Sequence, residues 1–478
     1  MFNQHADVWE KRWESLDRIL QAGHPTPPTP STPATMAGRS LPRQETLQSL
    51  RTCLLAFGRS HFDFFKDGFA GQRGIILEPS SEYPKEYVLN TVLRQVAFDL
   101  DVIERATQQR MATAVPDMIK TLHRADILAY TALEPAIQEH LLANTTVVTY
   151  FQKAATVRLV PYAPVTLIGI PFTAIDSPRD LLAIPHEVGH YVYRQGVFQS
   201  SQHTGSRVAA VLRKELSGHP AWLLNWLEEI FADIYGCLVA GPVIGLSFQA
   251  VAGQSTLAAF TEDDGEHPVH AVRSHIYTSV LRRSHFCEEA TKALEHAWQR
   301  QMAARQAPTQ FVPHEPDAAV KKEITLEAAN AEISTVIETI IDEHLKNLLD
   351  PDRIGPDSQA PVWIWDDLEE GERLDDLYTK FSARVEAMPD EDTPAVPELK
   401  AMDGENNRSV VRLEANKPST GIKPVAHKVG DTGLWIDAIK DAAHSERTLH
   451  MPPEVWTALL DSNGWATEGP GGLPHPKG

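Results

Sequence analysis

An HExxH motif occupies residues 186–190, as His186-Glu187-Val188-Gly189-His190. On a helix, this spacing puts two imidazoles one turn apart on one face with a carboxylate beside them. Imidazole nitrogens are common zinc ligands, and the glutamate is the residue type that takes a proton from a zinc-activated water. The motif predicts half of a zinc hydrolase site. The alternative interpretation is two ordinary helix histidines and a surface acid.

A third protein ligand is needed, and catalysis also needs a fourth position that water can occupy. Residues 222–239 are apolar almost all round, which predicts a buried helix. The helix contains Glu228, Glu229 and Asp233. Buried acids are rare and costly unless they are paired, hydrogen-bonded or bound to a metal. A membrane span is the competing interpretation, but three acids near its middle would cost several kcal/mol on insertion scales.

Glu229 is the predicted third ligand. Asp233 lies four residues later on the same helix face, where it can accept the second N–H of a ligating imidazole and fix that ring's tautomer. Glu228 points about 100° away. We interpret it as a solvent-facing acid, a partner for a cation or an acid in the pocket wall. Two neutral imidazoles and one carboxylate leave a net positive metal centre, which favours a catalytic over a structural zinc site.

The elements around the motif are also predictable. Residues 177–180, Ser-Pro-Arg-Asp, are typical of a helix start with Ser177 as N-cap. Pro185 cannot donate the helical hydrogen bond, so the helix either kinks there or begins anew. Residues 156–160 and 165–170 are β-branched runs separated by a Pro-containing turn, which predicts two strands. A sheet edge beside the motif helix could accept a peptide as an extra strand.

The whole pattern resembles the gluzincin metallopeptidases, whose zinc ligands are two motif histidines and a glutamate on a later helix. Residues 229–233, Glu-Ile-Phe-Ala-Asp, are similar to the ExxAD form of the heat-shock and prenyl-protein peptidases. That family also carries an HP-x4-R element, which His267, Pro268 and Arg273 match in the same chain order. The resemblance covers roughly residues 155–285. The chain differs from the family because its sequence has no transmembrane helix, so membrane substrates are not implied.

These features predict amide hydrolysis with Zn2+ held by His186, His190 and Glu229. Glu187 would take a proton from water and pass it to the leaving amine. The oxyanion needs a donor besides the metal, and the segment that the resemblance places near the site offers His267, His270, Arg273 and Tyr277. Among these, we assign catalytic roles to His267 and Arg273. The alternative for this segment is a helix start after an acidic loop.

Three classes of function are compatible with the sequence. The first is a soluble zinc metallopeptidase that acts on an extended peptide or protein substrate. The second is a zincin-fold scaffold or adaptor with a silent site, and the third is a hydrolase of another substrate, such as a small amide. The complete set of two histidines, Glu187 and Glu229 favours the peptidase, because a silent site has no physical reason to keep a buried acid opposite two histidines.

Composition sets the wider frame. The chain has 478 residues, a net charge of −20 and three cysteines. We expect two or three domains. The negative charge argues against nucleic acid or an anionic membrane as the main partner, and the few, widely spaced cysteines suit a reducing compartment. Residues 1–23 are rich in charges without an apolar core, so no signal peptide is predicted and a cytoplasmic location is expected.

The expected fold class is α+β, a mostly helical zincin-like core with a small β-sheet. The apolar stripe of residues 325–349 could form a dimer seam or pack on the chain's own core. The C-terminal tail could be a docking element, a pro-segment or plainly disordered, with short helices at 434–444 and 453–460. The expected regions are a tethered amphipathic helix at 1–23, a Pro/Thr-rich linker at 24–43, a helical domain at 44–154, the core at 155–350, an acidic helical segment at 351–388 and a Pro-rich, partly disordered region at 389–478.

Overall fold

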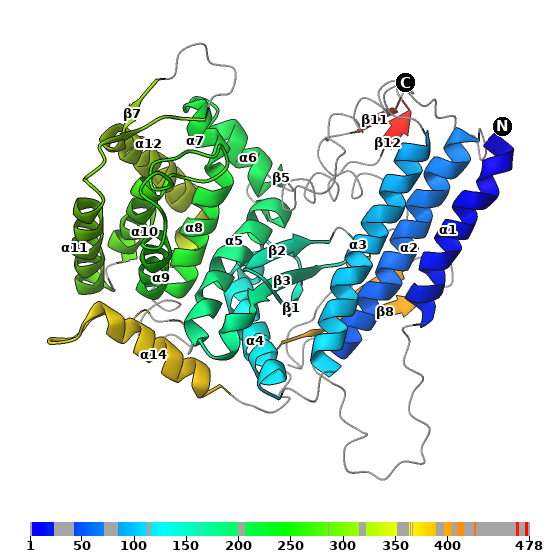
Figure 1. The fold of residues 1–478 in the computed structure, drawn as a ribbon, viewed down its shortest axis with the longest axis horizontal. Coiled ribbons are helices and arrows are strands. Elements are labelled where there is room, and N and C mark those ends of the chain that lie inside the picture. Colours follow the sequence, from blue (N-terminus) through cyan, green and yellow to red (C-terminus); the bar gives the residue numbers. More distant parts are fainter. Residues whose placement is uncertain are drawn as a thin grey trace, which may run out of the picture.

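A computed structural model gives the fold (Figure 1). It is mostly helical with small sheets, which confirms the α+β prediction. In the described part of the chain, no helix combines the length and apolar character that crossing a membrane requires. The structure describes residues 2–22, 43–70, 85–111, 116–160, 162–198, 206–284, 286–314, 322–350, 363, 365, 367–388, 396–403, 409–414, 425–426, 465–467 and 474–476.

Three helices lie side by side in a smaller lobe, α1 (Phe2–Ala22), α2 (Gln44–Phe69) and α3 (Lys85–Met111) (Figure 1). Trp9, Trp13 and Leu20 of α1 are buried in the core of this lobe. The Trp13 ring stacks on Phe62 with 5.3 Å between ring centroids. The expectation of a merely tethered first helix is therefore wrong, because its apolar stripe gains burial by packing on α2 and α3.

A three-stranded sheet lies between the two lobes (Figure 1), with strand order β1-β3-β2. The two predicted strands are present as β2 (Thr156–Leu159) and β3 (Val165–Pro171), which pair antiparallel. β1 (Thr146–Gln152) pairs parallel with β3 and lies in a segment that we predicted to be helical. Its β-branched and aromatic residues are buried on both faces, which removes the alternation that marks a half-buried strand.

The outer edge of β1 is closed by side chains of α3 and α4 (Pro116–Gln138). The Thr149 backbone N donates to the Asp126 carboxylate at 2.8 Å. The Thr149 carbonyl oxygen accepts from Arg110 at 2.7 Å. Gln109 binds both the N–H and the C=O of Phe151, at 2.7 and 2.9 Å. A further strand therefore has no backbone partners there, which leaves β2 as the other edge of this sheet.

The larger lobe is helical around a buried central helix, α8. Two short hairpins, β4–β5 and β6–β7, join its helices. The elements are η1 (Phe172–Ile175), η2 (Pro178–Ala183), α5 (Ile184–Gln195), β4 (Val197–Phe198), β5 (Ser206–Arg207), α6 (Val208–Glu215), α7 (Ala221–Asn225), α8 (Leu227–Ala240), α9 (Pro242–Ala252), α10 (His270–Ser284), α11 (Glu288–Ala304), β6 (Gln310–Phe311), β7 (Ile324–Thr325) and α12 (Leu326–Thr339).

The helix predicted at 325–349 begins at the N-cap Thr325, whose hydroxyl accepts from the Ala328 backbone N at 3.2 Å. It continues beyond α12 as a π-helical turn (Ile340–Leu345) and a 3-10 turn (Lys346–Leu349). Its apolar stripe is buried in the core of the larger lobe, where α12 packs on α10. Of the two interpretations of this stripe, the structure therefore favours packing on the chain's own core.

The acidic segment predicted as a helix is helical only in α14 (Leu374–Glu386) within the described residues. Asp367 precedes this helix and accepts the backbone N–H groups of Glu289 and Ala290, at 3.0 and 2.8 Å, at the start of α11. At least one acid of this segment therefore satisfies free backbone N–H groups at a helix N-terminus.

Part of the C-terminal region, which we predicted to be partly disordered, is docked on the smaller lobe. β8 (Glu398–Asp403) packs against α2 and pairs with β9 (Ser409–Glu414), which pairs with β10 (Val425–Ala426). A further hairpin is formed by β11 (Trp465–Thr467) and β12 (Pro474–Pro476). Val396 and Leu399 are buried, so this part of the region is ordered and packed on the lobe. Residues 24–42 of the linker predicted at 24–43, and the short helices predicted at 434–444 and 453–460, lie outside the described residues.

Candidate metal centre

The motif helix α5 begins anew at the proline, as one of the two predicted versions required. A 3-10 segment, η2, runs over Pro178–Ala183, and α5 starts at Ile184 with Pro185 in its first turn. A proline fits there because its missing N–H would have no helical partner in the first turn. Ser177 is the N-cap of η2, but its hydroxyl donates to Asp180 at 3.2 Å instead of capping the backbone.

The helix predicted at 222–239 is broken at Trp226 into α7 and α8, and α8 packs closely on α5. Gly189, the small residue inside the HExxH motif, allows the short distance between these two helices. A Cβ atom there would lie 2.7 Å from the Cα of Ala232, closer than real Cβ contacts allow. A Cβ on Gly236 would lie 3.2 Å from the His186 backbone N. The close crossing brings the side chains of the two helices together.

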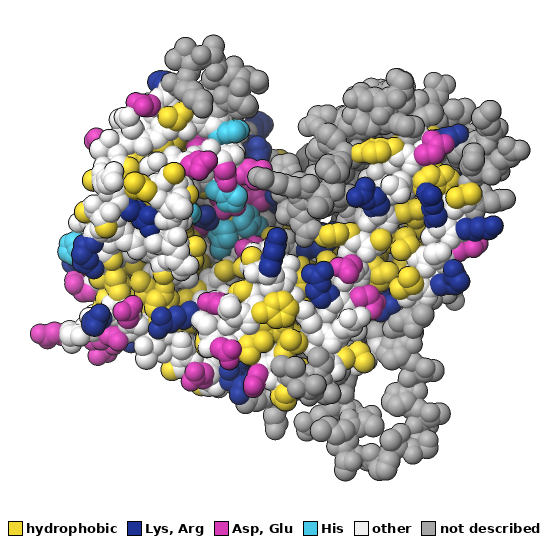
Figure 2. Space-filling model, in the orientation of Figure 1, with side chains coloured by type: hydrophobic (Ala, Val, Ile, Leu, Met, Phe, Trp, Pro, Cys, Tyr) yellow, Lys and Arg dark blue, Asp and Glu magenta, His cyan; other side chains and the backbone are white. Residues whose placement is uncertain are grey.

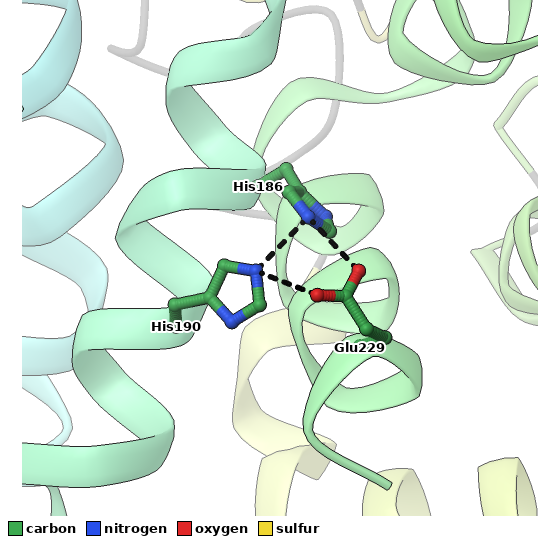
Figure 3. Close-up of side chains that lie close together, drawn as sticks. All are labelled: His186, His190 and Glu229. Atoms are coloured by element: carbon green, nitrogen blue, oxygen red, sulfur yellow. Dashed lines mark hydrogen bonds and ion pairs between the residues drawn. The ribbon is translucent and has the colours of Figure 1, made fainter. Parts of the chain in front are cut away.

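His186, His190 and Glu229 point toward one another from consecutive turns of α5 and from α8 (Figure 3). The two His Nε2 atoms are 3.1 Å apart, and Glu229 oxygens lie 3.4 Å from His186 Nε2 and 3.3 Å from His190 Nε2. A tetrahedral zinc ion with bonds of 2.0–2.1 Å separates its ligand atoms by about 3.3–3.4 Å. These three residues therefore fit a small tetrahedral cation.

Each of the two imidazoles has a carboxylate on its other nitrogen. Asp233 Oδ1 lies 2.9 Å from His186 Nδ1, the position predicted for it. Glu228 Oε1 lies 3.0 Å from His190 Nδ1 and accepts from Arg194 Nε at 2.6 Å. Glu228 is thus a cation partner, as one interpretation allowed, but it is not solvent-facing. Its role was missed because its direction toward α5 depends on how the two helices cross.

Arg273 and Tyr277 of α10 hold the carboxylates of α8. The Arg273 guanidinium donates to Asp233 at 2.6 and 2.9 Å and to Glu229 Oε2 at 2.9 Å. The Tyr277 hydroxyl donates to Asp233 at 2.6 Å. Two of the four predicted oxyanion donors are therefore engaged with acids of the site.

His267 lies at the edge of the triad. Its Nε2 is 3.5 Å from Glu229 Oε1, its Nδ1 is 2.8 Å from Asp264 Oδ2, and the side chain is 47% exposed. His270, another predicted donor, packs its ring against Phe248 and Phe260 instead. Burial and the nearby Arg273 and His267 lower the pKa of His270.

Glu187 is half-buried on α5, on the turn that carries His186. Within the described residues, its carboxylate has no hydrogen-bond or ion-pair partner, whereas Glu228, Glu229 and Asp233 each have several. Its oxygens are thus available to a water molecule or a substrate.

Glu228 and Glu229 stay ionised at neutral pH. Burial by itself would raise the pKa of Glu229, but His190, His186 and Arg273 outweigh burial and lower it well below its usual value. Burial would likewise raise the pKa of Glu228, but His190 and Arg194 outweigh burial and lower it to about 2. Burial would lower the pKa of His190, but the Glu229 and Glu228 carboxylates raise it well above its usual value. The site therefore attracts positive charge, whether protons or a metal ion.

The space-filling view shows histidine and acidic side chains gathered in a hollow at the level of α5 and α8 (Figure 2). Comparisons with protein-family models, with curated proteins and with solved structures returned no match for this chain. The possible metal-binding triad therefore rests on the geometry of the residues themselves.

Proposed function

We propose that this chain is a soluble, zinc-dependent metallopeptidase. The observation that carries the proposal is the spacing of the three ligand atoms, 3.1 to 3.4 Å, which suits tetrahedral zinc without rearrangement. The carboxylates on both histidine Nδ1 atoms support it, because such partners orient imidazoles toward a metal. The predicted domain boundaries and cytoplasmic location accompany this proposal as expectations.

Bound zinc would supply Lewis acidity at this site and lower the pKa of a water molecule toward neutrality. Glu187 would accept the proton of that water and deliver it to the leaving amine, since its carboxylate is otherwise unengaged. His267, protonated on both ring nitrogens, would donate its Nε2 proton in a hydrogen bond to the oxygen of the scissile carbonyl from the exposed side of the triad. For Arg273, the contacts with Asp233 and Glu229 favour a positioning role over the catalytic role predicted from the sequence.

The substrate class that we propose is an extended peptide segment. β2 is an edge strand that packs against the motif helix α5, whereas the edge of β1 is closed by side chains. A peptide that added to β2 would obtain main-chain hydrogen bonds beside the metal site. A small amide would gain nothing from such an edge, so the strand supports a peptide substrate.

Metal content tests the proposal first. Elemental mass spectrometry of purified wild type should find about one zinc per chain. Glu229→Ala should lose the zinc, and Glu187→Gln should keep it while losing hydrolysis of a peptide library. The Glu187→Gln variant is the matched control, because it removes an acid from the same site without removing a ligand.

Two results would contradict the proposal. A folded wild type that contains no zinc and takes up none would leave the scaffold interpretation. Zinc that survives Glu229→Ala would place the metal elsewhere on the chain.

A further inference from the structure

The turn that carries His267 is anchored by the buried Asp263. Its Oδ1 accepts from the Trp226 indole Nε1 at 3.0 Å and from the Gly265 backbone N at 2.9 Å, and its Oδ2 accepts from the His314 backbone N at 2.7 Å. These donors come from the residue before α8, from the turn and from the segment after β6. Asp263 therefore ties the turn to the start of the helix that carries Glu229.

Asp264 connects the turn to the imidazole itself. Its Oδ1 accepts the backbone N–H groups of Glu266 and His267, at 2.9 and 2.8 Å, and its Oδ2 lies 2.8 Å from His267 Nδ1. With Nδ1 held in this way, the ring presents its Nε2 to the triad. A side chain that is 47% exposed would otherwise sample several rotamers.

Gly265 makes the turn possible. Its φ of 86° lies in the left-handed region that disfavours other residues. A Cβ atom there would also lie 2.7 Å from Cδ2 of His314. The backbone of the turn is thus constrained by its own conformation and by its packing, and the two aspartates hold it in place.

We propose that Asp263 and Asp264 are positioning residues, which hold the His267 imidazole with Nε2 facing the metal site. The inference rests on the proposed function, in which His267 is protonated on both ring nitrogens. Its Nδ1–H stays on Asp264 and its Nε2–H donates to the substrate's carbonyl oxygen. The two carboxylates accept hydrogen bonds from the turn itself, from Trp226 and from His314. Their effect on the reaction would therefore be exerted through the position of His267. Such a donor assists only when it is held where charge develops in the transition state.

A double-mutant cycle tests this role. Loss of one oxyanion donor lowers kcat by about 100- to 1000-fold, which is the effect expected for His267→Asn. Asp264→Ala should lower kcat by about 10- to 100-fold with KM little changed, because the donor remains but is no longer held. The double variant should be no slower than His267→Asn alone. All variants should keep the zinc content of wild type.

Glu266→Gln is the matched control, because it removes one negative charge from the same turn and leaves both aspartates in place. Its kcat should stay within about twofold of wild type. Asp263→Asn should lower kcat by a factor similar to that of Asp264→Ala. The amide nitrogen of the new side chain would face one of the three N–H groups that Asp263 accepts, and two donors cannot form a hydrogen bond.

An NMR measurement decides the inference without activity. In protein labelled at histidine, the Nδ1 proton signal of His267 is identified by its loss in His267→Asn. We expect this signal in wild type and in Glu266→Gln, and its loss in Asp264→Ala. Asp264→Asn should lose the signal too. The oxygen of the new amide would stay on the two backbone N–H groups, so the amide N–H group would face His267 Nδ1 and could not accept its proton.

The outcomes separate the two proposals. Zinc binding without any peptide hydrolysis would remove the proposed function and leave the NMR signal to decide the positioning role. Hydrolysis by wild type with fully additive losses in the double variant, or an unchanged Nδ1 signal in Asp264→Ala, would overturn the positioning role alone.

Discussion

At the scale of single residues, each triad histidine has its own carboxylate and its own arginine. His186 meets Asp233, which Arg273 holds, and His190 meets Glu228, which Arg194 holds. The carboxylate fixes the orientation of the ring. The arginine balances the charge of the carboxylate, so the buried acids beside the triad are already paired.

The Glu228 contact leads to a prediction on metal affinity. Glu228→Ala should weaken zinc binding by about 10- to 100-fold, because His190 loses the partner that orients it. Competition with a chelator of known zinc affinity measures the change. Glu187→Gln is the control and should bind zinc as wild type does. Equal affinities for the Glu228→Ala protein and wild type would show that this contact does not orient the ligand.

At the scale of elements, the crossing of α5 and α8 determines the site. Gly189→Ala would place a methyl group 2.7 Å from the Ala232 backbone, which cannot move without shifting α8. A helix interior normally gains about 0.5–1 kcal/mol from Gly→Ala, but overpacking costs about 1–3 kcal/mol. We therefore expect Gly189→Ala to lower the free energy of unfolding and to weaken zinc binding.

Urea unfolding and zinc titration check this expectation. Gly218→Ala is the control, because a Cβ atom there meets open space, and its stability should stay within about 0.5 kcal/mol of wild type. A Gly189→Ala protein more stable than wild type would mean that the two helices can separate without cost.

The docking of α1 on α2 has a pH dependence of its own. Glu10 accepts from Lys66 at 2.8 Å and contacts Arg59 at 2.8 Å. Burial by itself would raise the pKa of Glu10, but these two cations outweigh burial and lower it below 4.5. A lowered folded-state pKa means that the stabilisation is present above about pH 4.5 and is lost as the pH falls further.

The test compares Glu10→Gln with wild type. The difference in unfolding free energy should be at most about 1 kcal/mol near neutral pH, since the pair is partly exposed. It should disappear as the pH falls below about 4.5. Hydrogen exchange of α1 amides reports the same loss locally. A difference that grows on acidification would contradict this assignment.

At the scale of the whole molecule, a segment from the C-terminal region completes the smaller lobe. The buried Arg43 donates to the carbonyl oxygens of Val396 and Pro397 at 2.6 and 2.7 Å. Glu398 accepts from the Arg43 backbone N at 2.8 Å and from the Thr46 backbone N at 3.1 Å. Residues more than 350 positions apart in the chain therefore share one buried polar network.

Deletion of residues 389–478 should therefore destabilise the smaller lobe. The Arg43 guanidinium would lose most of its partners, and uncompensated buried charge costs about 3–5 kcal/mol. Thermal and urea unfolding measure the loss. Deletion of 427–478 alone keeps β8 to β10 and should unfold close to wild type. Equal stability of the two truncated proteins would show that the contacts of 396–399 contribute little.

Several elements were predicted incorrectly for a common reason. β1 was taken for helix because it is buried on both faces, and α1 and residues 396–399 were taken for separate segments. Their structure depends on partners far away in the chain, which local periodicity does not report. The strands at 156–159 and 165–171 were predictable because a turn signal separates two β-branched runs.

The sequence by itself determined the residue types and their spacing. HExxH on a helix and a buried Glu229 with Asp233 one turn later already placed three candidate metal ligands on two helix faces, because helical period is a local property. Only the tertiary structure decided that α5 and α8 approach closely at Gly189 and that Glu228 points to His190. It also decided that the turn held by Asp263 and Asp264 brings His267 to the triad. Those contacts depend on packing between elements, which many sequences of the same local pattern would arrange differently.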